Sequence, residues 1–450
     1  MTRYIGLDLH KRVLEVCILD QGGHVEARMR LPVDRDSLAS FAKSELRLDD
    51  RVAVEATTNT WPVVELLRSY VADVTVSNPM ATKAIAQAKV KTDKIDARML
   101  AQLLRADFLP SVWQPDADTS RLRQLTNQRA SLVADRISIK NRIHAVLHQR
   151  LIPPPSTRLF NEHGRQWLDQ LEIDPDGRAA LRRDLHLLDE LEHAVAEVDR
   201  MLFRLAGEDP RIKLLITLPG VDVACAQTIL GALGDLSRFA DGDHAASYLG
   251  LVPSTKQSAE HAYHGPITKA GNTHARWMLV EAAQHLGNNP GPLGAFFRRL
   301  EHKKNRNVAV VATARKLVTI AYLLLTRGEP YRYAMPARTG DKLRNLRLRS
   351  GGARRPTGCP KGTRPIAKLP DGSSRTIKPL ATLYADEAVP GLLPPTAAEQ
   401  SMINRNPAVA AFVASLAEPQ VRPRQYRKPQ IHAPSVDTGG STDRARRPAR

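Results

Sequence analysis

Short apolar runs and longer amphipathic runs alternate along residues 3–106. Alternation of apolar and polar residues with period two predicts strands, and apolar residues three or four apart predict helices. By these rules the segment begins with three strands, and a Gly-rich turn at residues 21–23 makes the last two a hairpin. In chain order the predicted elements are strands at 3–9, 13–20 and 24–31, a helix at 37–46, a strand at 51–56, a helix at 61–70, a strand at 71–77 and a helix at 93–106.

Three antiparallel strands followed by alternating helices and strands form the order of an RNase H-like fold. We therefore expect residues 1–110 to be an α/β domain of this class, followed by a mostly helical remainder. The order matters for function because it brings the first strand, the fourth strand and the last helix together.

Residues 119–206 show a helical pattern that breaks at "IPPPS" (152–156) and again at "DPDG" (174–177). After the second break, apolar residues recur every seven positions, with charged residues between them. They are Leu181, Leu188, Val195 and Leu202, and also Leu191, Val198 and Leu205. This repeat predicts a coiled-coil spacer, and a helical hairpin that closes on itself within one subunit explains it equally well. In either form it is a spacer or assembly element.

Residues 209–336 form a second globular unit in this interpretation. It opens with "LITLPGVDVACAQTILGAL", a helix, a Pro219-Gly220 turn and a second helix, which is similar to a helix-hairpin-helix. The turn amides and the following helix N-terminus can hold a DNA phosphate, so Gly220 is a candidate nucleic-acid-binding residue. Many helical hairpins have such a turn without this role, and Asp222 stands where a second glycine would ease the approach of a phosphate.

From residue 337 to residue 450 the chain is rich in Arg, Lys, Gly and Pro. This composition predicts a basic, partly disordered extension that follows a phosphate backbone. Its middle, "SRTIKPLATLYADEA", is apolar enough for a small strand or helix.

The overall charge points to a polyanionic partner. The 450 residues contain 66 Lys+Arg against 47 Asp+Glu, for a formal net charge of +19. Nucleic acid fits this charge better than a membrane, because no amphipathic anchor accompanies it; a solvated basic surface is the plainer alternative. The apolar stretch from Val308 to Leu325 is interrupted by Arg315 and Lys316, which predicts a buried helix and no membrane span. Three scattered cysteines suit a reducing cytoplasm.

Four carboxylates in the first hundred residues are the strongest chemical signal. Asp8 and Glu55 lie at the ends of predicted strands, and Asp93 and Asp96 lie three apart on one helix face. Each alone is explained as a solvated acid or a helix cap. Brought together, they repel one another unless a cation neutralises them. Two divalent ions about 3.5–4 Å apart are the arrangement used for in-line attack on a phosphodiester.

With these elements placed, the chain resembles the DEDD transposases of bacterial insertion sequences. That family joins a RuvC-like amino-terminal domain to a carboxy-terminal transposase domain. The resemblance covers residues 3–333 and does not extend to the basic segment beyond Arg338. It rests on seven motifs in the family's order: "GLDLHK", "EATTN", "KTDKIDAR", "LPGV", "LGLVPS", "ITKAGNTHARWMLVEAA" and "ARKLVTIAYLLLTRGEPY".

The resemblance implies that Asp8, Glu55, Asp93 and Asp96 hold two Mg²⁺ ions. It also makes Lys91 and Lys94, beside the last two acids, candidates for phosphate contacts, although a solvated helix face explains them as well.

The resemblance further implies a nucleophilic serine after "LGLVP", where the family usually has a Ser-Gly pair. This chain has "STKQSAEH", so Ser258 aligns best, with Ala259 in place of the glycine, and Ser254 is the alternative. A serine needs a base or a metal to become a nucleophile. An ordinary loop serine remains the plainer interpretation. Near it, Lys269, Asn272 and Arg276 either bind phosphate or simply begin the next helix.

By resemblance, the protein is expected to cut and rejoin DNA so as to move its own insertion sequence. A structured RNA encoded by the element is expected to guide it, and one subunit's carboxylates are expected to meet another's serine in a homodimer or homotetramer. The expected location is the bacterial cytoplasm at the nucleoid. Two alternatives remain: a junction-resolving nuclease that uses water as the nucleophile, and a non-catalytic nucleic-acid-binding derivative.

Overall fold

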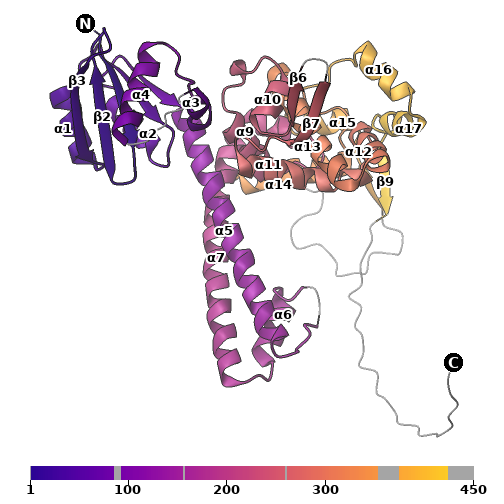
Figure 1. The fold of residues 1–450 in the computed structure, drawn as a ribbon. Coiled ribbons are helices and arrows are strands. Elements are labelled where there is room, and N and C mark those ends of the chain that lie inside the picture. Colours follow the sequence, from indigo (N-terminus) through magenta and orange to yellow (C-terminus); the bar gives the residue numbers. More distant parts are fainter. Residues whose placement is uncertain (1, 86–92, 156–157, 259–260, 353–373, 424–450) are drawn as a thin grey trace, which may run out of the picture. The chain divides into compact units, whose positions relative to one another are not determined.

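The computed structural model describes residues 2–85, 93–155, 158–258, 261–352 and 374–423 (Figure 1). The chain divides into two compact units, Met1–Asp116 and Ala117–Arg450. The first is a mixed α/β sheet unit, and the second is mostly helical, as the sequence pattern predicts.

The first unit contains a five-stranded sheet in the order β3-β2-β1-β4-β5. Strand β2 pairs antiparallel with both β1 and β3, whereas β4 runs parallel to β1 and β5 runs parallel to β4. The predicted strands and the main predicted helices are all present. The elements are β1 (Tyr4–Leu9), β2 (Val13–Leu19), β3 (Val25–Pro32), α1 (Arg35–Glu45), β4 (Arg51–Glu55), α2 (Thr60–Leu67), β5 (Asp73–Ser77), α3 (Pro79–Ile85) and α4 (Asp93–Arg105).

The two faces of this sheet are covered by different helices. Alternate residues of β1 and β4, such as Leu7 and Val54, pack with α1 and α2 in one apolar cluster. The residues between them face α4, which contributes Ala97 and Ala101 to one small cluster and Leu100 to another. The first strand, the fourth strand and the last helix therefore meet, as the predicted order requires.

The second unit begins with a long helical hairpin. Helices α5 (Ala117–His148) and α7 (Pro175–Glu208) run antiparallel, with α6 (Glu162–Gln170) between them in sequence. Ion pairs fix the direction: Arg129 Nε lies 2.6 Å from Asp199 Oδ1, and Arg142 Nη2 lies 2.6 Å from Asp184 Oδ1. The residue numbers of the paired side chains increase along α5 and decrease along α7, as they do in an antiparallel pair.

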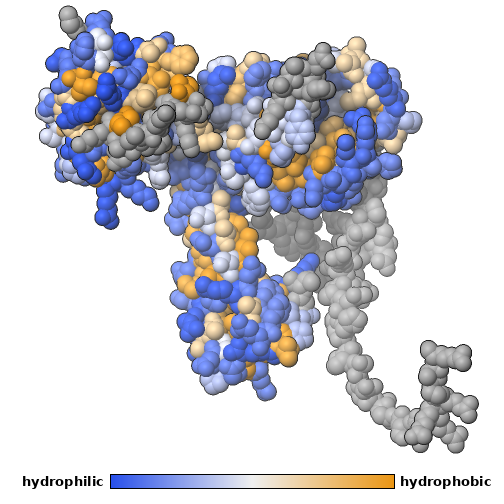
Figure 2. All heavy atoms as spheres, in the orientation of Figure 1, coloured by the Kyte–Doolittle hydropathy of each residue, from blue (hydrophilic) through white to orange (hydrophobic). Residues whose placement is uncertain are grey.

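The heptad seam of α7 is filled from within the same chain. Leu181 and Leu188 are fully buried with Ile143 and Leu147 of α5. Of the two arrangements that the repeat allows, the structure thus contains the hairpin within one chain. Ile137 of α5 is half exposed, and Figure 2 shows hydrophobic patches along this hairpin.

Leu188→Ala is expected to lower the free energy of unfolding by about 2–5 kcal/mol, because it leaves a cavity between α5 and α7. Leu187→Ala is the matched control, since Leu187 is 45% exposed and its truncation is expected to change stability by less than about 0.5 kcal/mol. Denaturant unfolding at several protein concentrations measures both. A destabilisation by Leu188→Ala that shrinks as protein concentration rises would instead indicate a seam between subunits.

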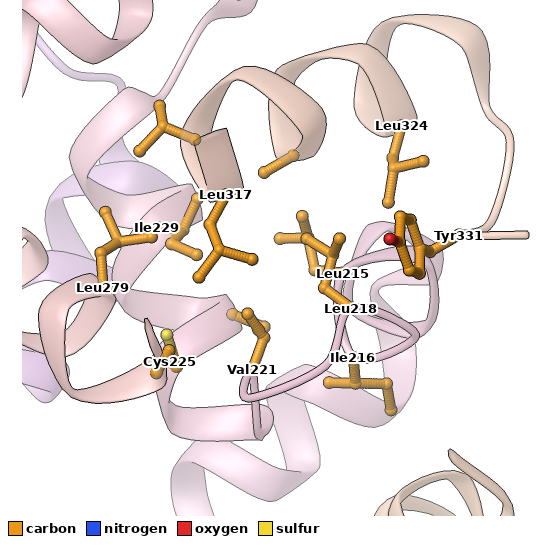
Figure 3. Packing of buried hydrophobic residues seen from close by; sticks show 14 of the residues in the cluster. Leu215, Ile216, Leu218, Val221, Cys225, Ile229, Leu279, Leu317, Leu324 and Tyr331 are labelled. Carbon is orange, nitrogen blue, oxygen red and sulfur yellow. The ribbon is translucent and has the colours of Figure 1, made fainter. Parts of the chain in front are cut away.

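The globular part of the second unit is built around one apolar core. Its elements up to residue 327 are α8 (Pro210–Leu215), α9 (Val223–Leu233), η1 (Leu236–Arg238), α10 (Gly242–Tyr248), β6 (Pro253–Ser258), β7 (His261–Ile267), α11 (Thr273–Gln284), η2 (Leu286–Asn288), α12 (Pro292–Lys303) and α13 (Arg306–Arg327). Figure 3 shows side chains of four helices meeting in this core, among them Leu215, Ile229, Leu279 and Leu317.

Helix α13 is the one described helix long and apolar enough to cross a membrane by length and composition. One of its faces, with Ala314, Leu317 and Ala321, is fully buried in the core. That burial is the one predicted for a core helix.

The core does not end near residue 336, where the sequence predicts the start of a basic extension. The next helix is α14 (Pro336–Arg349), and Leu343 and Leu346 on it are buried in the same core. After β8 (Ser374–Ile377), helix α15 (Leu380–Asp386) adds Tyr384, whose hydroxyl donates a 2.7 Å hydrogen bond to the Tyr331 carbonyl. The remaining elements are α16 (Ala397–Asn404), α17 (Pro407–Ser415) and β9 (Gln420–Pro423), which pairs with β8.

The prediction that the packed domain ends at 336/337 is therefore wrong, because the apolar core continues across this boundary. Leucines spaced at i and i+3 anchor α14 even though arginines and lysines surround them. Residues 353–373 and 424–450, which also carry the predicted extension, lie outside the described residues.

Candidate active site

Asp8 and Glu55 are neighbours on one face of the sheet. Leu7 of β1 pairs with Val54 of the parallel strand β4, so the next residue along each strand carries one of the two acids. Because successive strand residues point to opposite faces, Asp8 and Glu55 are on the α4 side, opposite the Leu7 and Val54 side chains. Asp8 is buried, with 6% of its surface exposed, and Glu55 is half-buried.

Helix α4 approaches β1 unusually closely at Gly6. A Cβ added there would overlap the Ala97 carbonyl and lie 2.7 Å from the Ala101 nitrogen. The later residues Leu100 and Leu104 pack near Tyr4 at the start of β1. The N-terminal end of α4 therefore points toward the end of β1, where Asp8 lies.

This orientation brings the two acids of α4 to the same edge of the sheet. Asp93 is the first residue of α4 and shares a helix face with Ala97, four residues on. Asp96 is adjacent to Ala97 and is partly exposed. The backbone thus brings the first turn of α4 to the end of the unit where Asp8 and Glu55 lie. The side chains of Asp93 and Lys94, and the whole of Lys91, lie outside what the structure describes.

The loops that follow β1 and β4 are tied to each other. His10 Nε2 lies 3.3 Å from Asp8 Oδ2, and the His10 carbonyl accepts a 3.3 Å hydrogen bond from Asn59 Nδ2. The Thr60 hydroxyl donates to the Glu55 carbonyl at 2.9 Å. These contacts explain why the "EATTN" residues accompany Glu55: they hold its strand end beside that of β1.

The donor set suits a hard divalent cation. Carboxylate oxygens are the ligands that Mg²⁺ prefers, and Asp8 and Glu55 supply two carboxylates on the same face of the sheet. Within the described residues, no three His, Cys, Asp or Glu side chains lie close enough together to hold a metal ion. The side chain of Asp93, which belongs to the predicted set, is not among those that the structure describes.

Gly6→Ala is expected to destabilise the first unit by at least about 1–3 kcal/mol, because the new methyl group must push α4 away from β1. The same shift would move Asp96 and Asp93 away from Asp8. Gly22→Ala is the matched control, since its Cβ would first meet the His24 ring at 3.1 Å, and that side chain can turn aside. Thermal unfolding of both variants measures the effect, and equal melting temperatures would contradict the close approach.

The candidate serines lie in a β-hairpin of the second unit. Ser258 is the last residue of β6 and stands opposite His261, the first residue of β7. The Ser258 side chain is outside the described set. Ser254 lies nearer the base of the hairpin, where its Oγ packs over Gly265. A Cβ added at Gly265 would come within 2.6 Å of that oxygen. Ser258 thus occupies the end of the hairpin, and Ser254 is half-buried within it.

Two of the predicted phosphate-binding residues have structural roles in the loop between β7 and α11. The Asn272 side chain caps α11 by accepting from the Ala275 amide at 2.9 Å. Arg276 is buried and donates to the carbonyls of Leu249 and Ala270 at 3.1 and 2.8 Å. These contacts fix the loop that carries the hairpin, and those of Arg276 occupy donors that a phosphate would need. Lys269, in contrast, is exposed in that loop at a positive φ of 55°.

Gly220 occupies the turn between α8 and α9 with a φ of 82°. A Cβ there would overlap the Ala282 carbonyl of α11, so glycine is required for packing as well as for the turn. Lys342 of α14 donates to the carbonyls of Leu218 and Val221 at 2.7 and 2.9 Å. Burial lowers the pKa of Lys342 to about 8.

Two residues near these sites were not selected from the sequence. Lys342 falls in the segment predicted to be an extension, so its contact with the turn was not foreseen. Glu15 lies within the apolar run of β2 and is buried beside Asp8. A charged residue inside an otherwise apolar strand is the signal that identifies it.

Comparison with known proteins adds independent information. A family model described as "Transposase" matches residues 5–152, and one described as "Transposase IS116/IS110/IS902 family" matches residues 212–292. The first stretch contains all four carboxylates, and the second contains Gly220 and Ser258.

Curated relatives match over much of the chain. The pilin gene-inverting protein of Moraxella bovis is 25% identical, over 73% of this chain and 97% of that protein. The transposase for insertion sequence element IS1111A of Coxiella burnetii is 24% identical, over 73% of this chain and 91% of that protein. The transposase for insertion sequence element IS1328 of Yersinia enterocolitica is 25% identical, over 53% and 72%.

Proposed function

This chain belongs to the IS110/IS116 family of transposases, and we propose that it cuts and rejoins DNA with metal-binding carboxylates and a serine nucleophile. The observation that supports the proposal is the meeting of β1, β4 and α4, the three elements whose ends carry Asp8, Glu55, Asp93 and Asp96. We infer that the first unit is RNase H-like and RuvC-like, because its strand order, β3-β2-β1-β4-β5, joins three antiparallel strands to two parallel ones.

In this proposal Asp8, Glu55, Asp93 and Asp96 hold two Mg²⁺ ions, which polarise the scissile phosphate and help to activate the nucleophile. The chain's own contributions are positional. Asn59 holds the two strand ends together, and Gly6 allows α4 to bring its acids close to Asp8.

Ser258 is the proposed nucleophile. Its Oγ forms a bond to phosphorus while the bond from phosphorus to one deoxyribose oxygen breaks, and that oxygen leaves as a hydroxyl with the serine proton. The phosphoserine link conserves the energy of the broken bond, so a strand hydroxyl can reverse the step and rejoin DNA without ATP. Arg276 acts as a positioning residue for the hairpin, because it fixes the loop at the hairpin's base.

The proposed partners are DNA, at the element ends and at the target, and an RNA encoded by the element. Lys91, Lys94 and Lys269 are proposed phosphate contacts, with Gly220 at the turn beside Lys342. The family resemblance also implies a homodimer or homotetramer in which the carboxylates and the serine come from different subunits. Guidance by RNA rests on family resemblance alone.

The experiment combines purified protein, supercoiled donor DNA, target DNA and the RNA from the element's end, with Mg²⁺ or with a chelator. Joined donor–target product that forms only with the divalent ion is the expected result. Nicked DNA that is never rejoined would favour a junction-resolving nuclease that uses water. DNA binding with no strand breakage under any condition would favour a non-catalytic derivative.

A further inference from the structure

Glu15 stands directly beside Asp8 in the sheet. In the antiparallel pairing of β1 and β2, Asp8 is opposite Glu15, and on the other side Glu15 is opposite Arg30 of β3. Asp8 and Glu15 are each 6% exposed. One row across the sheet therefore contains Arg30, Glu15 and Asp8, with Glu55 following on β4.

Glu15 points to the same side of the sheet as Asp8. Two and four residues further along β2, Cys17 and Leu19 pack against Ala97 and Ala101 of α4. The residues between them, Val16 and Ile18, belong to the cluster on the opposite face. By the alternation of strand side chains, Glu15 lies on the α4 face, within the acidic edge.

Two of the three charged side chains in this row are acids. Glu15 Oε1 is 3.2 Å from Arg30 Nε, but the Arg30 side chain is 66% exposed, so water screens much of its charge. Directly opposed residues on antiparallel strands have Cβ atoms about 4.5–5.5 Å apart, and like charges there destabilise the sheet. Two buried carboxylates thus face each other in this row, with His10 Nε2 3.3 Å from Asp8 Oδ2 on the other side. A divalent cation at the site would relieve their repulsion.

We propose that Glu15 is a positioning residue of the metal site: its buried negative charge strengthens divalent-cation binding at Asp8, and Arg30 limits that effect. The inference rests on the proposed metal role of Asp8 and extends it to a fifth carboxylate, which acts through Asp8 and needs no direct bond to the ion. The competing explanation is a simple Glu15–Arg30 ion pair that only stabilises the sheet. The two explanations predict different metal-binding constants for both variants and different metal-free melting temperatures for Glu15→Gln.

The test uses the full chain and titrates Mg²⁺ and Mn²⁺ by calorimetry, alongside thermal unfolding without metal. Glu15→Gln is expected to weaken metal binding by about 10–100-fold, the range found when outer-shell partners are removed, and not to lower the metal-free melting temperature. Arg30→Gln is expected to do the reverse: tighter metal binding and a lower metal-free melting temperature. An ion pair with no other role predicts that both variants lower the metal-free melting temperature and leave the dissociation constant unchanged.

Glu26→Gln is the matched control, because Glu26 is an exposed acid of β3 that lies 3.8 Å from Arg3; its metal binding is expected to equal that of the unmodified protein. Asp8→Asn distinguishes an error about the role of Glu15 from an error about the metal site itself. If the unmodified protein binds metal, Asp8→Asn does not and Glu15→Gln binds normally, then only the role of Glu15 is wrong. If the unmodified protein binds neither ion, the proposed metal site itself is wrong. Should Glu15→Gln fail to fold, the tighter binding expected of Arg30→Gln still decides the matter.

Discussion

Asp8→Asn should reduce metal-dependent DNA cleavage by more than the roughly 100-fold that loss of an outer-shell partner costs, while the chain stays folded. Asparagine keeps the size of the side chain and removes the buried charge opposite Glu15, so the sheet loses a repulsion as well as a metal ligand. Glu55→Gln and Asp96→Asn are expected to act in the same direction. A strand-cleavage assay with purified protein at several Mg²⁺ concentrations measures the effect.

Asp36→Asn is the control for this series, because Asp36 is an exposed acid in the first turn of α1. Its cleavage rate is expected to match that of the unmodified protein. Cleavage by Asp8→Asn within tenfold of the unmodified rate, in protein shown by unfolding to be native, would mean that the carboxylate edge is not the catalytic centre.

Ser258→Ala should eliminate both the covalent protein–DNA intermediate and the joined product, whereas Ser254→Ala should retain both. The reason is the hairpin: Ser258 lies at its end, while the Ser254 hydroxyl packs over Gly265. Denaturing gel electrophoresis of labelled DNA after reaction with each variant detects the intermediate. The reverse pattern would transfer the role to Ser254. Nicking by Ser258→Ala at the unmodified rate would indicate that water is the nucleophile.

The first unit could be predicted closely from the sequence because its signals are local. Strands β1, β2 and β4 are short apolar runs, and the predicted carboxylates lie at or near the ends of β1, β4 and α4. The order of the elements then determines which ends meet. The position of Glu15 beside Asp8 was not predicted, because it depends on the register between β1 and β2, which neither strand specifies alone.

The second unit was harder to predict because its decisive contacts are distant in sequence. The seven-residue repeat of α7 is the same whether the seam is filled by α5 or by another subunit. Arg276 has the composition and position of a phosphate ligand, and only its burial against Leu249 and Ala270 reveals what it holds. In α14, Leu343 and Leu346 are outnumbered by cations, so composition suggested an extension where the fold has a core helix.

The most direct test of the account is the identity of the amino acid that becomes linked to DNA. Protein trapped during the reaction with Mg²⁺, guide RNA and both DNAs would be digested and its peptides sequenced by mass spectrometry. The proposed mechanism predicts a nucleotide joined through phosphate to Ser258. This product should be present with Mg²⁺ and absent with the chelator or with Asp8→Asn. DNA that is cut and rejoined with no residue of the protein ever attached to it would contradict the account.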